Sequence, residues 1–344
     1  MLSWWRNVAP RKARLRIVVA LRGSELVAVA PMFQDEGYGG LIRYRTLAAG
    51  TGVPVEPLVT SGVEQEVLAL FAECFSTIDP RPDVFVLEGM TSRAPWPRIA
   101  MPTSGRERPW IHVDASALAP VLTLGGRTFD EWLVSRSRSF RKQMRRMRRQ
   151  LDQRGARFRL ARSQEEIDEG LRSFTLLHHA RWSPRGGSRA LGPGVDVMLR
   201  DASRELLSSH RFRLWSIEVD GRTISSHIFV GAGGHVSYWL GGFDDAWAEQ
   251  QPAMQSLLSA IEHAWAVGDE VVDFGHGAQP YKYRFADGDT SVTWMTVVPH
   301  NGRYLRSRLH LLPKQSFRDV SNRLPDSYKE RLRKVVGGRP GWAE

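Results

Sequence analysis

Two short stretches of this sequence place a carboxylate, a lysine and tyrosine hydroxyls close together along the chain. Asp273 follows Val271 and Val272 in the apolar run Glu270–Gly275, and Tyr281 and Lys282 follow a few residues later. A carboxylate at the end of a buried strand can act as a base or orient the lysine, and a tyrosine hydroxyl can donate a proton. A structural ion pair is the alternative role for Asp273.

Further candidates for proton transfer lie on or beside predicted strands. His227 lies between Ser226 and Ile228 on one face of a predicted strand. A histidine there is either a catalytic group or a core side chain with satisfied hydrogen bonds. Tyr238 and Tyr283 supply two more hydroxyl donors.

Cationic and aromatic side chains precede a glycine-rich loop, residues 183–194. His178, Arg181 and Trp182 lie at the end of a predicted helix. Such a pair of side-chain types suits sugars or phosphates, and the loop could close over an acceptor. Stabilisation of a helix C-terminus by positive charge is the alternative. We expect no zinc site from His178 and His179, because adjacent helical residues point about 100° apart.

The segment Ser135–Gly155 carries most of the excess positive charge. It has nine arginine or lysine residues and one acid, Asp152, which gives eight of the formal net charge of +11. Four apolar residues at helical spacing predict one buried stripe, with the charges on the opposite faces: Phe140, Met144, Met147 and Leu151. The basic faces either solubilise and brace the protein, contact phosphates through residues such as Arg141 and Arg145, or bind RNA.

Composition narrows the class of protein. The 344 residues suffice for two domains, and 42% are apolar, which excludes wholesale disorder. The single cysteine, Cys74, excludes an internal disulfide and a cysteine-based zinc cluster. No run approaches the roughly 20 apolar residues of a membrane span, and we find no signal peptide, which predicts a cytoplasmic location. Dinucleotide-binding and nucleophile-elbow motifs are absent from the sequence.

The N-terminal part predicts two strands, a helix and a further strand. The strands lie within Leu15–Gln34 and are joined at Arg22-Gly23-Ser24. Apolar spacing predicts a helix over 63–78, and a short apolar run predicts a strand over 82–90. Residues 91–109, rich in Pro, Arg and Ser, are a candidate linker or surface loop.

The C-terminal part predicts helix, strand, helix, three strands, helix and two strands, in that order. Asp220-Gly221 and Gly233-Gly234 are hairpin turns between the three strands. The next helix has Pro252 at its first position and Gly268 at its end. An antiparallel meander would thus be followed by a helix and by a strand parallel to the last meander strand.

This order resembles the GNAT acyltransferase core. The runs Tyr238–Asp244 and Asp273–Lys282 resemble those of GNAT-like proteins assigned to cellulose or exopolysaccharide biosynthesis. The similarity is good over residues 130–290 and thinner over 14–90. The Tyr-Lys-x-x-Phe piece is also similar to the end of Fem aminoacyl-tRNA-dependent transferases. The resemblance implies an α+β fold of two tandem GNAT-like domains with a mixed, mostly antiparallel central sheet.

The resemblance also sets the expected domains. Residues 1–125 would be a degenerate or shortened GNAT-like domain, and residues 126–300 the C-terminal GNAT domain with a basic linking helix, 130–154. The basic tail 301–344 is expected to pack as helices on the first domain. Its alternative role is peripheral attachment to anionic lipid at the inner membrane. Because family members begin with a further helix, we expect either a degenerate first half or a start that lies upstream.

The same family implies an acyl-CoA donor. In a GNAT fold the pantetheine arm pairs with the fourth strand, and the pyrophosphate sits at the N-terminus of the following helix. The residues implied for this binding are Trp239, Leu240, Gly241, Gln250, Gln251, Ala253 and Met254. Ala253 stands where the family commonly has glycine, which narrows the room for close backbone approach.

The implied reaction is N- or O-acylation of a sugar, a glycan precursor or a related amine. Fem transferases use the lysine of their motif near the reacting phosphate or carbonyl, so Lys282 is the implied electrostatic stabiliser. The other catalytic candidates are Asp273, Tyr281, Tyr238 and His227. The acceptor-binding candidates are Arg141, Arg145, His178, Arg181 and Trp182. Aminoacyl transfer from tRNA and a non-catalytic scaffold are the alternatives, and DNA binding is not expected, because no recognition motif accompanies the arginines.

Overall fold

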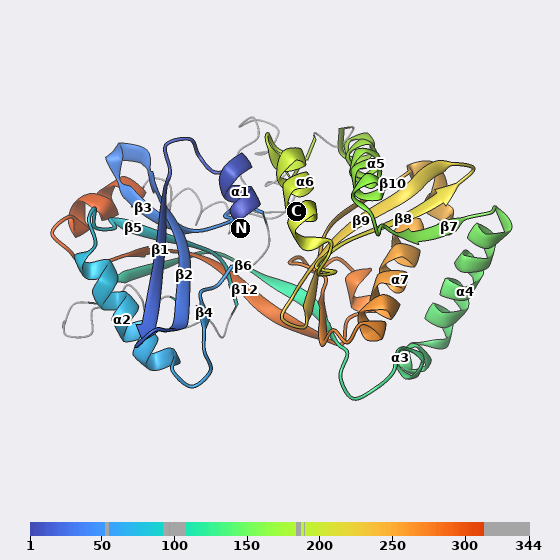
Figure 1. Cartoon of the computed structure of the whole chain (residues 1–344), viewed down its shortest axis with the longest axis horizontal. Helices are drawn as coiled ribbons and strands as arrows, with labels where there is room; N and C mark the ends of the chain where they lie inside the picture. Colours follow the sequence, from blue (N-terminus) through green and yellow to red (C-terminus); the bar gives the residue numbers. More distant parts are fainter. Residues whose placement is uncertain (52–54, 92–95, 97–107, 184–186, 189, 313–344) are drawn as a thin grey trace. The chain divides into compact units, whose positions relative to one another are not determined.

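The computed structural model describes all residues except 52–54, 92–95, 97–107, 184–186, 189 and 313–344. The chain divides into two compact units (Figure 1). Unit 1 comprises Met1–Val8 and Leu118–Thr290, and unit 2 comprises Ala9–Ala117 and Ser291–Glu344. The sequence places the first boundary at residue 125, whereas two strands, β6 (Trp110–Thr123) and β12 (Gly288–Val298), cross the divisions between these units.

Unit 2 is a mixed sheet with a helix packed on it. Its strands follow the order β1-β2-β3-β5-β12, and β4 pairs with β2. The bounds of its other elements are β1 (Arg14–Arg22), β2 (Glu25–Glu36), η1 (Tyr38–Gly40), β3 (Ile42–Thr46), β4 (Leu58–Val59), α2 (Glu64–Thr77) and β5 (Val84–Thr91). The predicted hairpin, helix and strand of this region are confirmed, and β3 is an addition. Most of the predicted linker 91–109 lies outside the described residues.

The core of unit 2 lies between α2 and the sheet. Val67, Phe71 and Phe75 recur at helical spacing on α2 and are buried. Phe75 meets Phe85 of β5 edge to face, with 5.2 Å between the ring centroids. The described part of the basic tail belongs to this unit too, since Tyr304 packs against a buried cluster around Val298. The rest of the predicted helical tail lies outside the described residues.

Unit 1 contains the predicted meander. Its strands follow the order β6-β11-β10-β9-β8-β7; β7 to β10 are antiparallel, and β10 and β11 are parallel. The bounds of its other elements are α1 (Leu2–Asn7), α3 (Phe129–Ser135), α4 (Arg138–Gln153), β7 (Arg157–Leu160), α5 (Gln164–Trp182), α6 (Val195–Leu206), β8 (Phe212–Val219), β9 (Arg222–Ala232), β10 (His235–Phe243), η4 (Asp245–Gln250), α7 (Pro252–Ala266), β11 (Val271–Asp273) and η5 (Lys282–Arg284).

The basic segment forms two helices, where the sequence predicts one continuous helix over 130–154. The helix α3 begins with a capping box at Thr128 and ends at Ser135, and Arg136 is extended. Ser137 then caps α4 by accepting a hydrogen bond from the backbone N–H of Phe140. A serine side chain that satisfies a free helical N–H explains the restart. The predicted apolar stripe of α4 is buried.

Helices cover both faces of the unit 1 sheet (Figure 1). Adjacent residues of β9 show which helix covers which face. Ser225 Oγ lies 3.2 Å from the hydroxyl of Ser256 on α7, whereas Ser226 Oγ donates to the carbonyl of Gly170 on α5. Because successive strand residues point to opposite faces, α5 and α7 lie on opposite sides of the sheet.

Candidate active site

The parallel pair β10 and β11 separates part-way along β10. Pairing joins His235–Ser237 to Val271–Asp273 and then stops, although β10 continues to Phe243. The chain after β11 turns to β6 instead, where the N–H groups of Phe274 and Gly277 donate to backbone carbonyls at 3.0 and 2.8 Å. The second half of β10 is therefore not paired with β11, and β10 is the strand with which the GNAT resemblance pairs the pantetheine arm.

Gly241 makes room for two side chains over this second half of β10. It stands opposite His227 on β9, after a bulge at Trp239. A Cβ atom at position 241 would lie 2.0 Å from His227 Nδ1 and 2.6 Å from the Tyr238 hydroxyl. Such distances are forbidden, so only glycine allows His227 and Tyr238 to meet here. The Tyr238 hydroxyl thus lies over the part of β10 that β11 does not pair.

A chain of hydrogen bonds runs from α7 to Tyr238. Ser256 Oγ lies 3.2 Å from Ser225 Oγ, Ser225 Oγ lies 3.0 Å from His227 Nε2, and His227 Nδ1 lies 3.3 Å from Tyr238 Oη. His227 is 2% exposed. Burial, together with the nearby positive charge of Arg181, lowers the pKa of His227 to about 3. The ring is therefore neutral at physiological pH.

The tyrosine candidates differ in environment. Burial raises the pKa of Tyr238 well above its ordinary value, and burial also raises the pKa of Tyr281. The positive charge of Arg181 opposes both shifts. Tyr281 and Tyr283 are 37% and 39% exposed, and a hydrogen bond with Asp289 is the main reason that the pKa of Tyr283 is raised. The structure thus brings Tyr238, Tyr281 and Arg181 into one electrostatic neighbourhood.

Lys282 is buried and two of its three N–H donors are engaged. It is 4% exposed, and Nζ donates to the carbonyls of Gly275 and His276 at 3.0 and 2.9 Å. Burial lowers the pKa of Lys282 to about 8, while the Asp273 carboxylate acts in the opposite direction. Asp273 accepts a hydrogen bond from the N–H of Gly275, and burial raises its pKa. Both residues therefore hold the turn that leads the chain away from β10.

The cationic and aromatic cluster lies on the α5 side of β10. His178 is fully buried between Phe174 and Trp182, and neither ring nitrogen has a hydrogen-bond partner among the described residues. Burial lowers its pKa, although the nearby Gly241 backbone favours the protonated ring. The guanidinium carbon of Arg181 lies 4.2 Å from the centre of the Phe243 ring. Arg181 therefore covers the end of β10.

The N-terminus of α7, where the resemblance places a pyrophosphate, uses several of its own groups. Gln251 is left-handed, with φ 49°, and its carbonyl accepts from the N–H groups of both Met254 and Gln255. Pro252 has no N–H to offer. The Gln251 side chain accepts from Gln143 of α4 at 2.9 Å. These contacts leave fewer amides for a phosphate than a glycine-rich loop would.

The remaining cofactor and acceptor candidates fall on four elements. Trp239 and Leu240 lie in the second half of β10, Gln250 is the last residue of η4, and Ala253 is the second residue of α7. Three acidic residues occupy the same connection, which disfavours a phosphate there: Asp244, Asp245 and Glu249. On α4, the Arg141 side chain donates to the carbonyl of Val134, whereas Arg145 is exposed.

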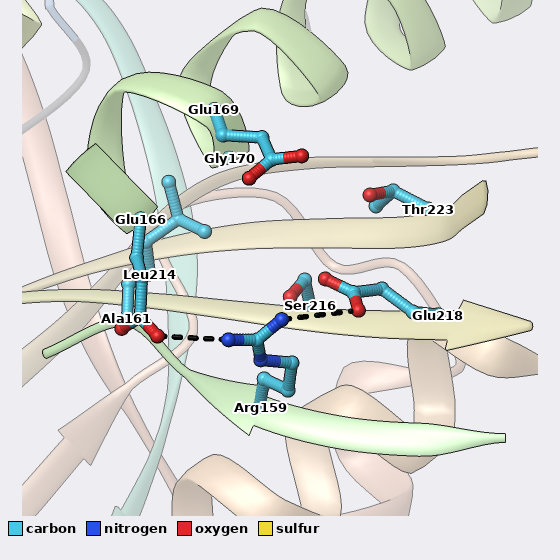
Figure 2. A pocket seen from close by; sticks show the side chains of 9 residues that line it. All are labelled: Arg159, Ala161, Glu166, Glu169, Gly170, Leu214, Ser216, Glu218 and Thr223. Carbon is cyan, nitrogen blue, oxygen red and sulfur yellow. Dashed lines mark hydrogen bonds and ion pairs between the residues drawn. The ribbon is translucent and has the colours of Figure 1, made fainter. Parts of the chain in front are cut away.

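Figure 2 shows a separate pocket between α5 and strands β7 to β9. Arg159 reaches across it to Glu166 at 2.8 Å and to Glu218 at 3.3 Å. No predicted site residue lines this pocket. Over the described ranges, no group of three metal-ligating side chains gathers, and no helix has the length and apolarity to cross a membrane.

Sequence reasoning missed Ser225 and Ser256. The signal for Ser225 was available, because it lies two residues before His227 on a strand and so shares its face. Ser256 lies on α7, and only the packing of α7 against β9 brings it within hydrogen-bond distance. Gly241 was predicted for its backbone, whereas the structure gives a side-chain reason for it.

Comparison with known proteins agrees with this geometry. Residues 138–283 match the family described as acetyltransferase (GNAT) domain. This part of the chain is similar to a GNAT acetyltransferase domain. The domain's presence supports the predicted acyltransferase class, and the mixed, mostly antiparallel sheet agrees with the predicted GNAT fold. No curated protein matches the sequence.

Solved structures extend the fold likeness beyond the GNAT domain. FemX is 11% identical, with 87% of this chain and 90% of FemX covered and a TM-score of 0.62. A C-terminal domain assigned to a lysylphosphatidylglycerol synthetase of Agrobacterium fabrum is 11% identical, with 87% and 86% covered and a TM-score of 0.54. L-PGS from Bacillus licheniformis is 10% identical, with 86% and 87% covered and a TM-score of 0.54. At these identities the likeness concerns the fold.

Proposed function

We propose that this GNAT domain transfers an acyl group to an amine or hydroxyl over the second half of β10. The observation that carries the proposal is the end of β10–β11 pairing at Ser237 and Asp273. An extended donor arm can pair there with the backbone of Trp239–Phe243 like an added strand. The Tyr238 hydroxyl, which lies over Gly241, would then be near the reacting carbonyl.

The proposed chemistry needs a proton donor and stabilisation of an oxyanion. The acceptor attacks the acyl carbon, and collapse of the tetrahedral intermediate breaks the bond to the leaving group, which takes a proton. We assign that proton to Tyr238. Arg181 supplies a fixed positive charge that favours the developing oxyanion. Lys282 and Asp273 are assigned to holding the turn at Gly275, because two N–H groups of Lys282 and Oδ1 of Asp273 are engaged there.

Acyl-CoA is the first candidate donor. The stretch of β10 that does not pair with β11 favours it, since a pantetheine arm has the amide groups that an added strand requires. Its phosphates would have to avoid Asp244, Asp245 and Glu249, and we therefore place them against α4, whose Gln143 contacts Gln251.

An acyl ester carried on RNA is the second candidate donor. Two observations favour it: the α7 amides are engaged by Gln251, and α4 exposes basic side chains without carboxylate partners among the described residues, including Arg145 and Arg149. The fold neighbours FemX and the lysylphosphatidylglycerol synthetase domain make such a donor worth testing.

For the acceptor, we propose a sugar or glycan-precursor amine on the α5 side. Buried His178 has ring nitrogens without partners, and Trp182 beside it supplies an aromatic face. A polar ring with hydroxyl groups would satisfy the imidazole and pack on the indole. Arg181 would bind a phosphate or carboxylate on such an acceptor.

Binding and product formation test the proposal together. Calorimetry with acetyl-CoA, longer acyl-CoAs and aminoacyl-tRNA should show binding of one donor class, and mass spectrometry should show acylated glucosamine. Tyr238→Phe removes only the hydroxyl and should lower kcat by about 10²-fold or more. Tyr304→Phe in unit 2 is the matched control and should leave turnover unchanged. A folded protein that binds no donor of either class would contradict the proposal.

A further inference from the structure

The hydrogen-bond chain from Ser256 to Tyr238 can run in two directions. In the outward direction, Ser256 donates to Ser225, Ser225 donates to His227 Nε2, and His227 Nδ1–H donates to Tyr238 Oη. In the inward direction every proton is reversed, and Tyr238 donates to His227 Nδ1. The oxygen and nitrogen positions are the same in both cases.

The two directions differ in the groups that they leave unpaired. Ser256 is 1% exposed and Ser225 is fully buried. In the inward direction the Ser256 O–H would have no acceptor, because among the described residues Ser225 is the only hydrogen-bond partner of the Ser256 side chain, and Ser225 would be donating to it. A buried donor without an acceptor costs about 1–3 kcal/mol. In the outward direction the O–H without an acceptor is that of Tyr238, which is only partly buried, whereas in the inward direction it is that of Ser256, which is enclosed.

From this we infer that Ser256, Ser225 and His227 are positioning residues that turn the Tyr238 O–H outward, toward the leaving group of the acyl donor. The inference rests on the proposed acyl transfer and adds to it the tautomer of His227 and two serines. Tyr238 is the group that touches the reacting atoms, and the other three act through it. His227 carries its proton on Nδ1, the nitrogen that faces Tyr238.

The proposed step balances. When the carbon–leaving group bond breaks, the leaving group takes both electrons and receives the Tyr238 proton. The tyrosinate oxygen is then held by His227 Nδ1–H, which needs no change in the charge of the imidazole. The proton that the acceptor nitrogen or oxygen loses on forming the new bond returns to Tyr238. The negative charge stays on the Tyr238 oxygen, and the three groups behind it remain neutral, because burial lowers the pKa of His227.

Measuring the tautomer of His227 tests the direction of the hydrogen-bond chain without any turnover. Long-range proton–nitrogen NMR correlations on the uniformly labelled full chain distinguish a protonated imidazole nitrogen from a bare one. The His227→Gln variant assigns the signal. We expect a neutral ring with Nδ1 protonated, whereas histidine in water prefers the proton on Nε2. A proton on Nε2 would mean that Tyr238 donates inward, and it would overturn the inference.

Kinetics with two acetyl donors test the role in catalysis. Phenyl acetate has the poorer leaving group and p-nitrophenyl acetate the better one, and glucosamine serves as acceptor for both. Ser225→Ala should lower kcat about tenfold with phenyl acetate and much less with p-nitrophenyl acetate, because only the poor leaving group depends on a well-aligned proton. Ser226→Ala is the matched control, since it is equally buried but faces α5.

Two outcomes separate the inference from the proposed function. Equal slowing of both donors by Ser225→Ala would make the serine merely structural and would overturn the inference while acyl transfer stands. Absence of transfer from any donor would refute the proposed function, and the nitrogen signals of His227 would still decide the direction of the chain.

Discussion

Two buried polar groups flank the place where β10 and β11 separate, and they use their protons differently. On one side, Lys282 is charged and directs its ammonium inward, to the carbonyls of Gly275 and His276. On the other side, the hydrogen-bonded chain that ends at Tyr238 contains only neutral groups at physiological pH. The charged group braces the backbone, whereas the neutral chain keeps one proton for a substrate.

The difference follows from the cost of burial. A buried ammonium requires several acceptors at once, and nearby carbonyls of a turn provide them. A neutral hydroxyl can remain partly unsatisfied at modest cost until a ligand arrives. The residue that looks most reactive in the sequence, Lys282, is therefore the one whose donors are engaged. The four predictions below test this contrast.

The largest expected effect is on the pH dependence of the unfolding free energy, because His227 stays neutral in the folded protein at low pH. Its folded pKa of about 3 lies below the ordinary 6.5, so the unfolded chain binds more protons between these values. The histidine's contribution to the unfolding free energy is complete above pH 6.5 and is lost as pH falls, by at most about 1.4 kcal/mol per pH unit. Urea unfolding at several pH values should show the gap between wild type and His227→Gln shrinking from pH 7 to pH 4.

The exposed His235 gives the control for this experiment. His235→Gln removes an imidazole that is exposed instead of buried, so it controls for the loss of a histidine as such. A gap between wild type and His227→Gln that does not change with pH would mean that His227 is not held neutral by burial.

The next largest effect is expected from removing the buried ammonium group of Lys282. Lys282→Met keeps most of the apolar stem but removes both hydrogen bonds to the turn. We expect a loss of about 3 kcal/mol in unfolding free energy, since hydrogen bonds from charged groups contribute roughly 1.5–3 kcal/mol each. Lys142→Met on the exposed face of α4 should change stability by less than about 0.5 kcal/mol. Full stability together with lost turnover in Lys282→Met would instead make Lys282 a catalytic residue.

Much of the fold was predictable because it follows local rules. The stripe of α4 from Phe140 to Leu151 and the meander turns at Asp220-Gly221 and Gly233-Gly234 require only helical periodicity and turn chemistry. The break at Ser137 was missed, because a single serine inside a strong helical pattern gives a weak signal until its side chain is seen to cap Phe140.

The candidate site was predictable by residue type and less so by geometry. His227 and Tyr238 were both candidates, but their contact depends on the bulge at Trp239, which shifts the pairing of β9 and β10 by one residue. The engagement of Lys282 depends on the path of the turn at Gly275. Both are tertiary features, so neither side-chain spacing nor propensity reveals them.

A smaller effect is expected from filling the space above β10. Gly241→Ala would place a Cβ 2.0 Å from His227 Nδ1, so the pair must separate. Overpacking of this kind costs about 1–3 kcal/mol, and we expect turnover to fall at least as far as in Tyr238→Phe. Gly125→Ala is the matched control, because its Cβ meets nothing within 4 Å. Normal turnover in Gly241→Ala would show that the His227–Tyr238 contact is dispensable.

The smallest effect on stability, and the one that decides between the donors, concerns the exposed charges of α4. Arg145 and Arg149 are exposed and have no carboxylate partner among the described residues, whereas Arg148 pairs with Asp152 and stacks on Phe158. The double variant Arg145→Gln, Arg149→Gln should have an unfolding free energy within about 0.5 kcal/mol of wild type, since exposed arginines contribute little to stability.

If RNA carries the acyl group, each lost phosphate contact should reduce the slope of log affinity against log salt by about 1. An unchanged slope for aminoacyl-tRNA, with Arg148→Gln as comparison, would leave α4 as a solvated face and favour acyl-CoA. The arginines of α4 would then differ from both Lys282 and Tyr238, because they would bind neither a backbone carbonyl nor a substrate.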